Sequence, residues 1–302
     1  METPCKIAVL GGDDRQIFMA RALAEHNFSV SAWGLSMAQE RLAPARVAKS
    51  WEEAIENADC VILPLPASSD GIRVHCPLYH GEEIPRITSL LAGIEGKTLL
   101  GGKLTPPVLQ AAQQHGVRCV DYFDSEILQL KNALPTAEGA IGIAMKELPV
   151  TLDGSTVGVI GYGRIGALLS EKLTALGARV LVYARRSEQL TMAELHHQVP
   201  VPLTDHRGRR ALESIPSECR ALFNTVPAWI LDKTALERIP PSCVIIDLAS
   251  APGGLDHQLA AQLGLRTVWA TSLPGRCTPE SAGQILAATI EELLTSVLSD
   301  RG

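Results

Sequence analysis

The sequence predicts an α/β protein with two doubly wound domains, the second of which is a Rossmann dinucleotide-binding domain. Three observations support this fold class. Short aliphatic runs alternate with helical stretches from Lys6 onward, the alternation stops near Pro149 and restarts at Thr156, and a glycine-rich fingerprint follows the first strand of the second round. Only 4% of the residues are aromatic, so the cores must be aliphatic, as in parallel sheets.

The composition limits the classes of protein to which the chain can belong. Its 302 residues are enough for two domains, and 46% hydrophobic and 20% charged residues are ordinary for a globular protein. The formal net charge of -6 argues against a nucleic-acid surface, and no apolar run is long enough to span a membrane. The seven cysteines occur singly and no signal peptide precedes Lys6, so we expect no metal site and a soluble, cytoplasmic protein.

The first half alternates strands with helices. Gly11 and Gly12 end the first strand, and Asp13 or Asp14 caps a helix that continues to about Glu25. Segment 67–87 has no clear period and is expected to be a long loop. A further helix is expected over 106–115, and the strands expected in this half are Lys6–Leu10, Phe28–Trp33, Cys60–Leu63, Thr98–Leu100 and Arg118–Tyr122.

Two helices, 125–131 and 136–146, are expected between the halves, with Pro135 in the first turn of the second one. The pattern then restarts with a helix over 165–176. The final helix, 279–298, has too many apolar positions to stand alone in water, so it packs on the first domain or forms a homo-oligomer contact. The expected strands are Thr156–Ile160, Arg179–Tyr183, Ala221–Thr225, Val244–Leu248 and Thr267–Ala270.

These patterns divide the chain into two expected domains. Residues 1–134, with 280–302 returning to them, form a substrate and partner domain. Residues 135–279 form the Rossmann domain.

The clearest motif is a GxGxxG fingerprint between a strand and a helix, the context in which it indicates a dinucleotide site. Gly161 permits the tight turn, Gly163 lets the backbone approach a pyrophosphate, and Gly166 lets helix and strand pack closely. The helix N-terminus then presents N–H groups to the phosphates. The motif residues are Gly161, Tyr162, Gly163, Arg164, Ile165 and Gly166.

The end of the next strand favours NADP over NAD. An NAD enzyme carries Asp or Glu there, which binds the ribose 2′-hydroxyl. Here Ala184 removes that carboxylate, Arg185 and Arg186 supply guanidinium groups for a 2′-phosphate, and Ser187 adds a hydroxyl. The alternative is that the two arginines are ordinary surface charges.

Two later strand ends are expected to line the nicotinamide half of the groove, because ligands gather at the carboxyl ends of strands in doubly wound sheets. Asn224 and Thr225 are candidates for hydrogen bonds to the carboxamide or ribose, whereas Asp247 is equally suited to cap a helix. The residues of these strand ends are Asn224, Thr225, Val226, Pro227, Asp247, Leu248, Ala249 and Ser250.

The first turn of the chain differs from this fingerprint. Gly11-Gly12-Asp13-Asp14 lacks the third glycine and puts two carboxylates where a phosphate would lie, so it is not a second dinucleotide site. It is either a plain turn or an edge of the substrate cleft.

The order of parts resembles the D-2-hydroxyacid dehydrogenases. Those enzymes carry an Arg after the fourth Rossmann strand and a late catalytic His, and neither is present in 247–254 or 272–279. The chain more closely resembles the family of dipicolinate synthase A subunits. That similarity rests on Asn132–Ala140, Gly161–Gly166, Asp247–Ser250, Pro252–Gly254, Leu273–Gly275 and Thr278-Pro279, with weaker similarity along nearly the whole chain.

The resemblance implies oxidation of dihydrodipicolinate to dipicolinate with a nicotinamide cofactor. It also implies a place in the mother cell during sporulation and a second, flavoprotein-like subunit. A dicarboxylate substrate needs cationic partners, for which Lys103 and Arg276 lead, and Glu138 or His75 is the candidate general base. Each of these has a plain structural alternative, such as a surface charge or, for Glu138, a favourable charge at a helix start.

Three other functions remain open from the sequence. One is an alanine dehydrogenase-like enzyme, which would rely on Lys103 and His75. Another is a 2-hydroxyacid dehydrogenase-like enzyme. The third is a non-catalytic scaffold subunit that binds NADP.

Overall fold

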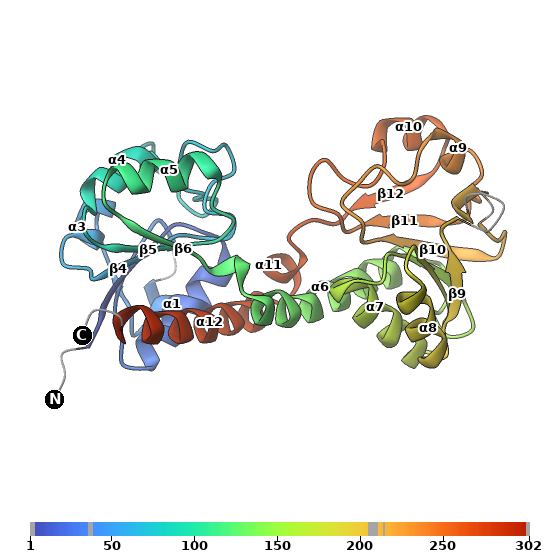
Figure 1. Cartoon of the computed structure of the whole chain (residues 1–302), viewed down its shortest axis with the longest axis horizontal. Coiled ribbons are helices and arrows are strands. Elements are labelled where there is room, and N and C mark those ends of the chain that lie inside the picture. Colours follow the sequence, from blue (N-terminus) through green and yellow to red (C-terminus); the bar gives the residue numbers. More distant parts are fainter. Residues whose placement is uncertain (1–3, 36–38, 205–210, 214, 300–302) are drawn as a thin grey trace. The chain divides into compact units, whose positions relative to one another are not determined.

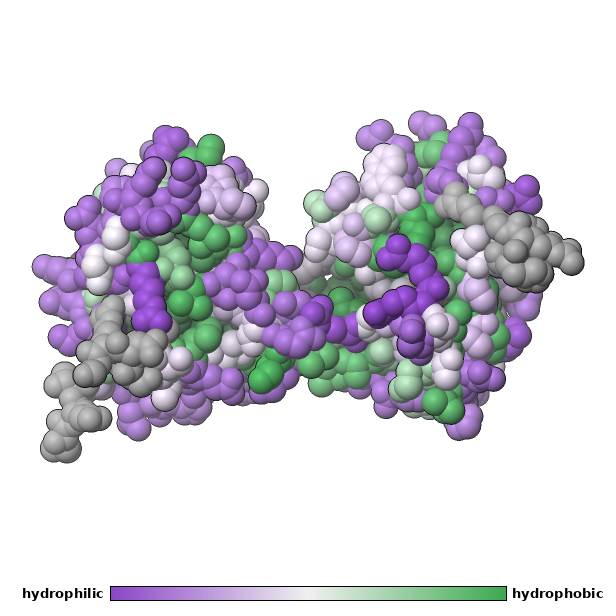
Figure 2. All heavy atoms as spheres, viewed as in Figure 1, coloured by the Kyte–Doolittle hydropathy of each residue, from purple (hydrophilic) through white to green (hydrophobic). Residues whose placement is uncertain are grey.

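The computed structural model describes residues 4–35, 39–204, 211–213 and 215–299 (Figure 1). The chain divides into two compact units. Unit 1 comprises Met1–Asn132 and Pro274–Gly302, and unit 2 comprises Ala133–Leu273. Each unit is built around its own parallel sheet of six strands. The surface seen in Figure 2 is mainly hydrophilic or neutral, and apolar atoms reach it in limited patches.

The sheet of unit 1 has the strand order β3-β2-β1-β4-β5-β6. Its strands are β1 (Lys6–Leu10), β2 (Ser29–Trp33), β3 (Arg46–Val47), β4 (Cys60–Ile62), β5 (Thr98–Gly101) and β6 (Arg118–Asp121). This is the Rossmann order, whose direction reverses between β1 and β4, so a crevice is expected at that switch point.

Helices cover both faces of this sheet, as Figure 1 shows. One face carries α1 (Asp14–Glu25) and α12 (Pro279–Ser299), and the other carries α3 (Trp51–Ile55), α4 (Ile87–Gly93) and α5 (Pro106–Gln114). The short α2 (Gln39–Leu42) and the 3-10 turn η1 (Tyr122–Asp124) complete the unit. Asp13 caps α1 through a capping box with Gln16, which selects Asp13 over Asp14 as the cap.

The sheet of unit 2 has the order β12-β11-β10-β7-β8-β9, again the Rossmann arrangement. Its strands are β7 (Thr156–Ile160), β8 (Arg179–Ala184), β9 (Val199–Pro202), β10 (Cys219–Asn224), β11 (Val244–Asp247) and β12 (Arg266–Trp269). The helices are α6 (Glu126–Glu147), which begins in unit 1, α7 (Arg164–Ala175), α8 (Ser187–Leu195), α9 (Lys233–Leu236) and α10 (His257–Gln262), with the 3-10 turn η2 (Ala211–Glu213). The short helix α11 (Leu273–Cys277) starts at the last residue of unit 2 and continues in unit 1. The predicted fold class is confirmed.

The sequence left open whether the C-terminal helix packs on the first domain or forms a homo-oligomer contact. Leu286, Ile290 and Leu294 of α12 are buried in one cluster with Ile17 and Leu23 of α1. The apolar face of α12 therefore packs on the first unit of its own chain.

Two predictions about local structure at prolines were wrong. The two helices expected around Pro135 are one continuous helix of 22 residues, α6. Pro135 removes one backbone hydrogen bond, but buried Ala133, Ala137 and Ala140 hold the helix by packing. The strand β9 was missed because Pro200 and Pro202 argue against a strand, yet β9 lies at the sheet edge, where proline is tolerated.

No helix within the described ranges combines the length and hydrophobicity that crossing a bilayer requires.

Candidate functional site

A pocket of about 440 Å³ opens at the carboxyl ends of β7, β8 and β10 in unit 2. This is the point where the strand order reverses, and ligands bind there in doubly wound sheets. Its lining residues are Gly161, Tyr162, Gly163, Ala184, Arg185, Gln189, Leu203, Thr225, Val226, Pro227, Ala228, Trp229 and Ile230. The pocket therefore brings together three parts of the predicted cofactor site.

Each glycine of the fingerprint is required for a different structural reason. Gly161 has a φ of +92°, which side chains rarely adopt, and a Cβ there would lie 2.5 Å from Thr225 Oγ1. A Cβ on Gly166 would collide with the carbonyl oxygen of Gly161. Gly163 differs, because a Cβ there would meet nothing within 4 Å. Gly163 thus opens onto the space that a ligand would occupy.

The start of α7 is suited to an anion. Gly163 is its N-cap and makes no side-chain cap hydrogen bond, and Arg164 and Ile165 form the first turn. The first N–H groups of a helix have no partner within the helix, and the helix dipole favours negative charge there. A pyrophosphate group fits this arrangement.

The arginines expected to select NADP lie at the end of β8. Ala184 is buried and lines the pocket together with Arg185. Arg186 is the N-cap of α8, Ser187 is its first residue, and both are exposed outside the pocket lining. Within the described ranges of the chain, neither arginine forms a salt bridge.

The structure adds pocket residues that the sequence analysis missed. Gln189 donates a hydrogen bond from Nε2 to the carbonyl of Tyr162, at 2.8 Å, and so ties α8 to the glycine loop. Trp229 is 64% exposed although it is large and apolar, and it lines the pocket with its neighbours Ala228 and Ile230. Its position just after Pro227 was the signal that could have identified it.

Asn224 and Asp247 have a different role from the one expected. Both side chains are fully buried and lie side by side in the register of β10 and β11. Asn224 Nδ2 donates to Asp247 Oδ1 at 2.8 Å, and Asp247 also accepts from the backbone N–H groups of Ala249 and Gly254. These residues hold the loop after β11 rather than face a cofactor. Asp247 is also not a helix cap, because α10 is capped by Asp256.

The rest of the loop after β11 lies outside the pocket lining as well. Leu248 and Ala249 are buried and Ser250 is exposed, and none of the three is among the lining residues. In contrast, Thr225 lines the pocket while its Oγ1 donates to the carbonyl of Ile160, at 2.9 Å.

His257 was not singled out from the sequence, yet it completes the network around Asp247. Its Nε2 lies 3.3 Å from Asp247 Oδ2 and its Nδ1 lies 3.1 Å from Thr267 Oγ1. Its ring stacks on Trp269 at 5.3 Å between centroids. Because both ring nitrogens are engaged, His257 supports the loop and is poorly placed to act as a base.

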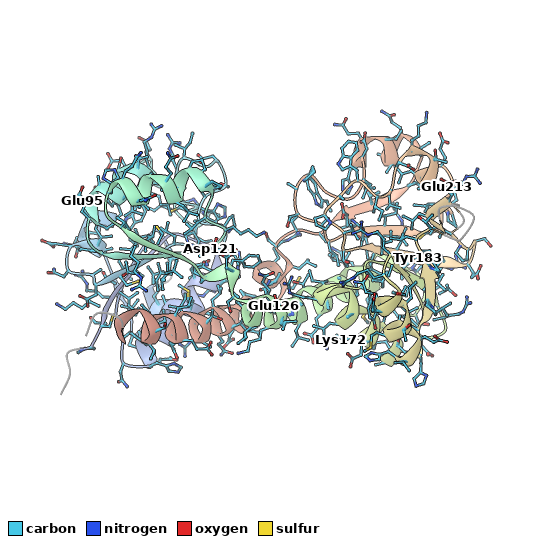
Figure 3. All side chains as sticks on the ribbon, viewed as in Figure 1. Glu95, Asp121, Glu126, Lys172, Tyr183 and Glu213 are labelled. Carbon is cyan, nitrogen blue, oxygen red and sulfur yellow. The ribbon has the colours of Figure 1, made fainter. Side chains whose placement is uncertain are left out.

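Glu138 lies elsewhere in unit 2. Its carboxylate is exposed and forms a salt bridge of 3.1 Å with Lys172 Nζ of α7, which is labelled in Figure 3. The two residues line a second hollow of about 450 Å³ with Ile141, Met145 and Leu176. This hollow shares no lining residue with the pocket beside the glycine loop, which disfavours Glu138 as the general base.

The other candidates for substrate binding and catalysis, Lys103, His75 and Arg276, belong to unit 1. His75 is partly buried, and its carbonyl accepts from Gly12 N–H at 2.8 Å. Burial lowers the pKa of His75 below its ordinary value, while nearby Asp13 opposes the shift. Lys103 and Arg276 are exposed.

The first glycine turn is closed by the chain itself. A Cβ on Gly11 would collide with Cys76 Sγ, so the segment after His75 covers this turn. Buried Arg15 binds both Asp13, in a salt bridge of 2.8 Å, and the carbonyl of Leu65. With Asp13 also capping α1, unit 1 has no open cradle here like that of unit 2.

The late segment of the chain meets this turn. A Cβ on Gly275 would lie 2.8 Å from Asp13 Oδ2 and 2.9 Å from Arg15 Nε. The turn after β1, the loop containing His75 and the segment before Arg276 therefore converge at the carboxyl edge of the first sheet. That the turn forms an edge of the substrate cleft stays a prediction.

Comparison with known proteins gives matches to both units. Residues 6–123 match the family model for the N-terminal domain of the dipicolinate synthase A subunit, and residues 138–263 match "D-isomer specific 2-hydroxyacid dehydrogenase, NAD binding domain". The dipicolinate synthase A subunit of Bacillus subtilis is 31% identical over 303 residues, which is 100% of both chains.

Solved structures agree with these matches. The structure of the dipicolinate synthase A subunit from Bacillus halodurans has a TM-score of 0.86 and 26% identity, covering 97% of this chain and 99% of that one. The corresponding structure from Bacillus subtilis has a TM-score of 0.83 and 30% identity, covering 99% of each.

Proposed function

Because the chain belongs to the family of dipicolinate synthase A subunits, we propose that it is an NADP-dependent oxidoreductase that converts dihydrodipicolinate to dipicolinate. The observation that carries the proposal is the nucleotide pocket of unit 2, which places Arg185 beside the glycine loop of a dehydrogenase-like domain. Loss of a hydride and a ring proton from dihydrodipicolinate gives the aromatic pyridine-2,6-dicarboxylate. Aromatisation favours this step, so placement of the ring matters more than a strong base.

The residues of unit 2 fit the cofactor. The N–H groups at the start of α7 would bind the pyrophosphate, and Arg185 and Arg186 would bind the 2′-phosphate. Thr225 and Trp229 line the same pocket. When bound, the nicotinamide accepts the hydride.

The residues of unit 1 would bind the substrate and take its proton. Lys103 and Arg276 supply positive charge for the two carboxylates. His75 is the leading proton acceptor, since burial lowers its pKa and so favours the neutral imidazole, the form that can accept a proton. The family resemblance supports a site of action in the mother-cell cytoplasm and a partner that is a second, flavoprotein-like subunit. The homo-oligomer expected from the sequence remains part of the proposal.

The cofactor choice is tested by calorimetric titration with NADP and NAD. We expect NADP to bind about 10- to 100-fold more tightly than NAD, and Arg185→Ala and Arg186→Ala to remove most of that difference while NAD binding stays within about twofold. Arg238→Ala, an exposed arginine of unit 2 outside the pocket, is the matched control. Equal affinity of the wild type for both dinucleotides would refute the choice of NADP.

The reaction is tested by supplying dihydrodipicolinate and NADP, with and without the second subunit, and following NADPH absorbance. An absorbance rise is expected, at least with both subunits present. Tight NADP binding without any turnover in the reconstituted complex would instead indicate a scaffold subunit.

A further inference from the structure

Lys103 has an unusual backbone conformation. Its φ is +55°, in the left-handed region that favours glycine. Three other described residues share a positive φ without being glycine, namely Asn27, His197 and Ser272. Asn27 and His197 directly follow the C-caps of α1 and α8, where this conformation is common, and Ser272 directly precedes α11. Lys103 instead follows the strand β5.

One carboxylate holds Lys103 in this conformation. Asp121 accepts the Lys103 N–H at 3.0 Å through Oδ1 and the Leu104 N–H at 2.7 Å through Oδ2. Asp121 ends β6 directly beside Gly101, the last residue of β5, and is labelled at that strand end in Figure 3. The bonds therefore connect the loops that follow two neighbouring strands.

The same carboxylate also places the ring beneath the lysine. Asp121 Oδ1 accepts the Phe123 N–H at 2.8 Å, and Lys103 Nζ lies 5.0 Å from the centroid of the Phe123 ring. A cation over an aromatic face is attracted to it, which narrows the positions that a flexible lysine samples. The side chain of Lys103 is nevertheless exposed.

Glycine would be the simpler residue if only the turn mattered. Gly101 and Gly102 precede Lys103, and a third glycine would adopt the same backbone without strain. Strained residues of this kind gather at ligand sites, where the surrounding structure holds them. The position is also a strand end at the carboxyl edge of a doubly wound sheet, where ligands bind.

We propose that Asp121 is a positioning residue that holds Lys103 so that its ammonium group receives one carboxylate of a pyridine dicarboxylate. The inference deepens the proposed function and rests on it. Asp121 acts through Lys103, which touches the substrate.

The first experiment separates the side chain from the backbone. Lys103→Gly relieves the strain and is expected to raise the melting temperature by roughly 2–4 °C, while the Kd for pyridine-2,6-dicarboxylate rises about 10- to 100-fold. Asn27→Gly is the matched control, because it relieves the same kind of conformation at a helix end. It should stabilise the protein without changing that Kd.

A double-mutant cycle tests whether Asp121 acts through Lys103. Asp121→Ala should raise the KM for the dicarboxylate substrate with little change in kcat. In a Lys103→Ala background it should have almost no further effect on KM or on the Kd. Circular dichroism at the assay temperature confirms that each variant is folded. Equal effects of Asp121→Ala with and without Lys103 would overturn the inference.

The outcomes also distinguish this inference from the proposed function. If the wild type binds pyridine-2,6-dicarboxylate and Lys103→Gly binds it equally well, only the role of Lys103 and Asp121 falls. If the wild type binds no dicarboxylate, alone or with NADP present, both proposals fall.

Discussion

The helices α1 and α7 each follow the first strand of their sheet, and in each the N-cap residue decides whether the helix start can bind an anion. At α1 the carboxylate of Asp13 accepts the Arg15 N–H, so the chain itself supplies the negative charge. At α7 the cap is Gly163, which has no side chain to do this. Because phosphate and carboxylate compete for the same N–H groups, only the second helix remains suited to a dinucleotide.

Two neighbouring glycines should therefore respond differently to substitution by alanine. In Gly163→Ala the new methyl group enters open space, so stability is retained while the Kd for NADP rises at least about 10-fold, because the pyrophosphate can no longer approach. In Gly166→Ala the methyl group meets the Gly161 carbonyl, so the melting temperature falls by several degrees. Thermal unfolding and cofactor titration check both; equal melting temperatures for the two variants would contradict this account.

The site residues differ in how well the sequence alone predicts their roles. Gly161, Gly163 and Gly166 were identified because the fingerprint is local and its spacing reflects one turn. Asn224 and Asp247 were misjudged because their burial results from pairing between β10 and β11, which are 23 residues apart at these positions. No local pattern reports that burial.

The helix α12 closely approaches α1 at Gly283. A Cβ on Gly283 would lie 2.6 Å from the carbonyl oxygen of Arg15 and from Phe18 Cβ on α1. The small residue therefore allows the two helices to pack near that point. The buried residues Leu286 and Ile290 follow it along α12.

We expect Gly283→Ala to destabilise unit 1 by about 1–3 kcal/mol, because the methyl group forces the helices apart. Gly142→Ala is the matched control in α6, since a Cβ there meets nothing within 4 Å. It should stabilise the protein by up to about 1 kcal/mol through helix propensity alone. Urea unfolding measures both, and a neutral Gly283→Ala would argue against close helix packing.

Prediction of the elements was best where periodicity was strong. The aliphatic strands and the final helix were predicted to within a few residues. The expected long loop 67–87 contains an isolated bridge between Arg73 and Arg86, and α4 begins at its last residue, Ile87. The elements that were missed are the edge strands β3 and β9 and the helices α2, α3, α4, α8, α9, α10 and α11. Their few residues carry too little pattern, and their stability comes from packing on the sheet.

At the scale of the molecule, two sheets with the same strand order perform different tasks. The buried clusters that line their faces are each drawn from one unit only. We propose that the dinucleotide binds to unit 2 and the dicarboxylate to unit 1. A ligand that binds one unit should then stabilise that unit against unfolding more than it stabilises the other.

Differential scanning calorimetry tests this separation. Two transitions are expected, and NADP at 100 times its Kd should shift one of them, adding about 2.7 kcal/mol to the stability of unit 2. Gly283→Ala should shift the other. A single transition that both changes move together would show that the units unfold as one.

The sequence by itself determined the fold class, the dinucleotide fingerprint and the family, because these depend on periodicity and on spacings within one turn or one strand. Only the tertiary structure decided which residues line the pocket, that Glu138 is paired with Lys172, and that Asp121 constrains Lys103. The physical reason is that burial, hydrogen bonding and a strained backbone angle are set by groups distant in the chain, and folding alone brings those groups together.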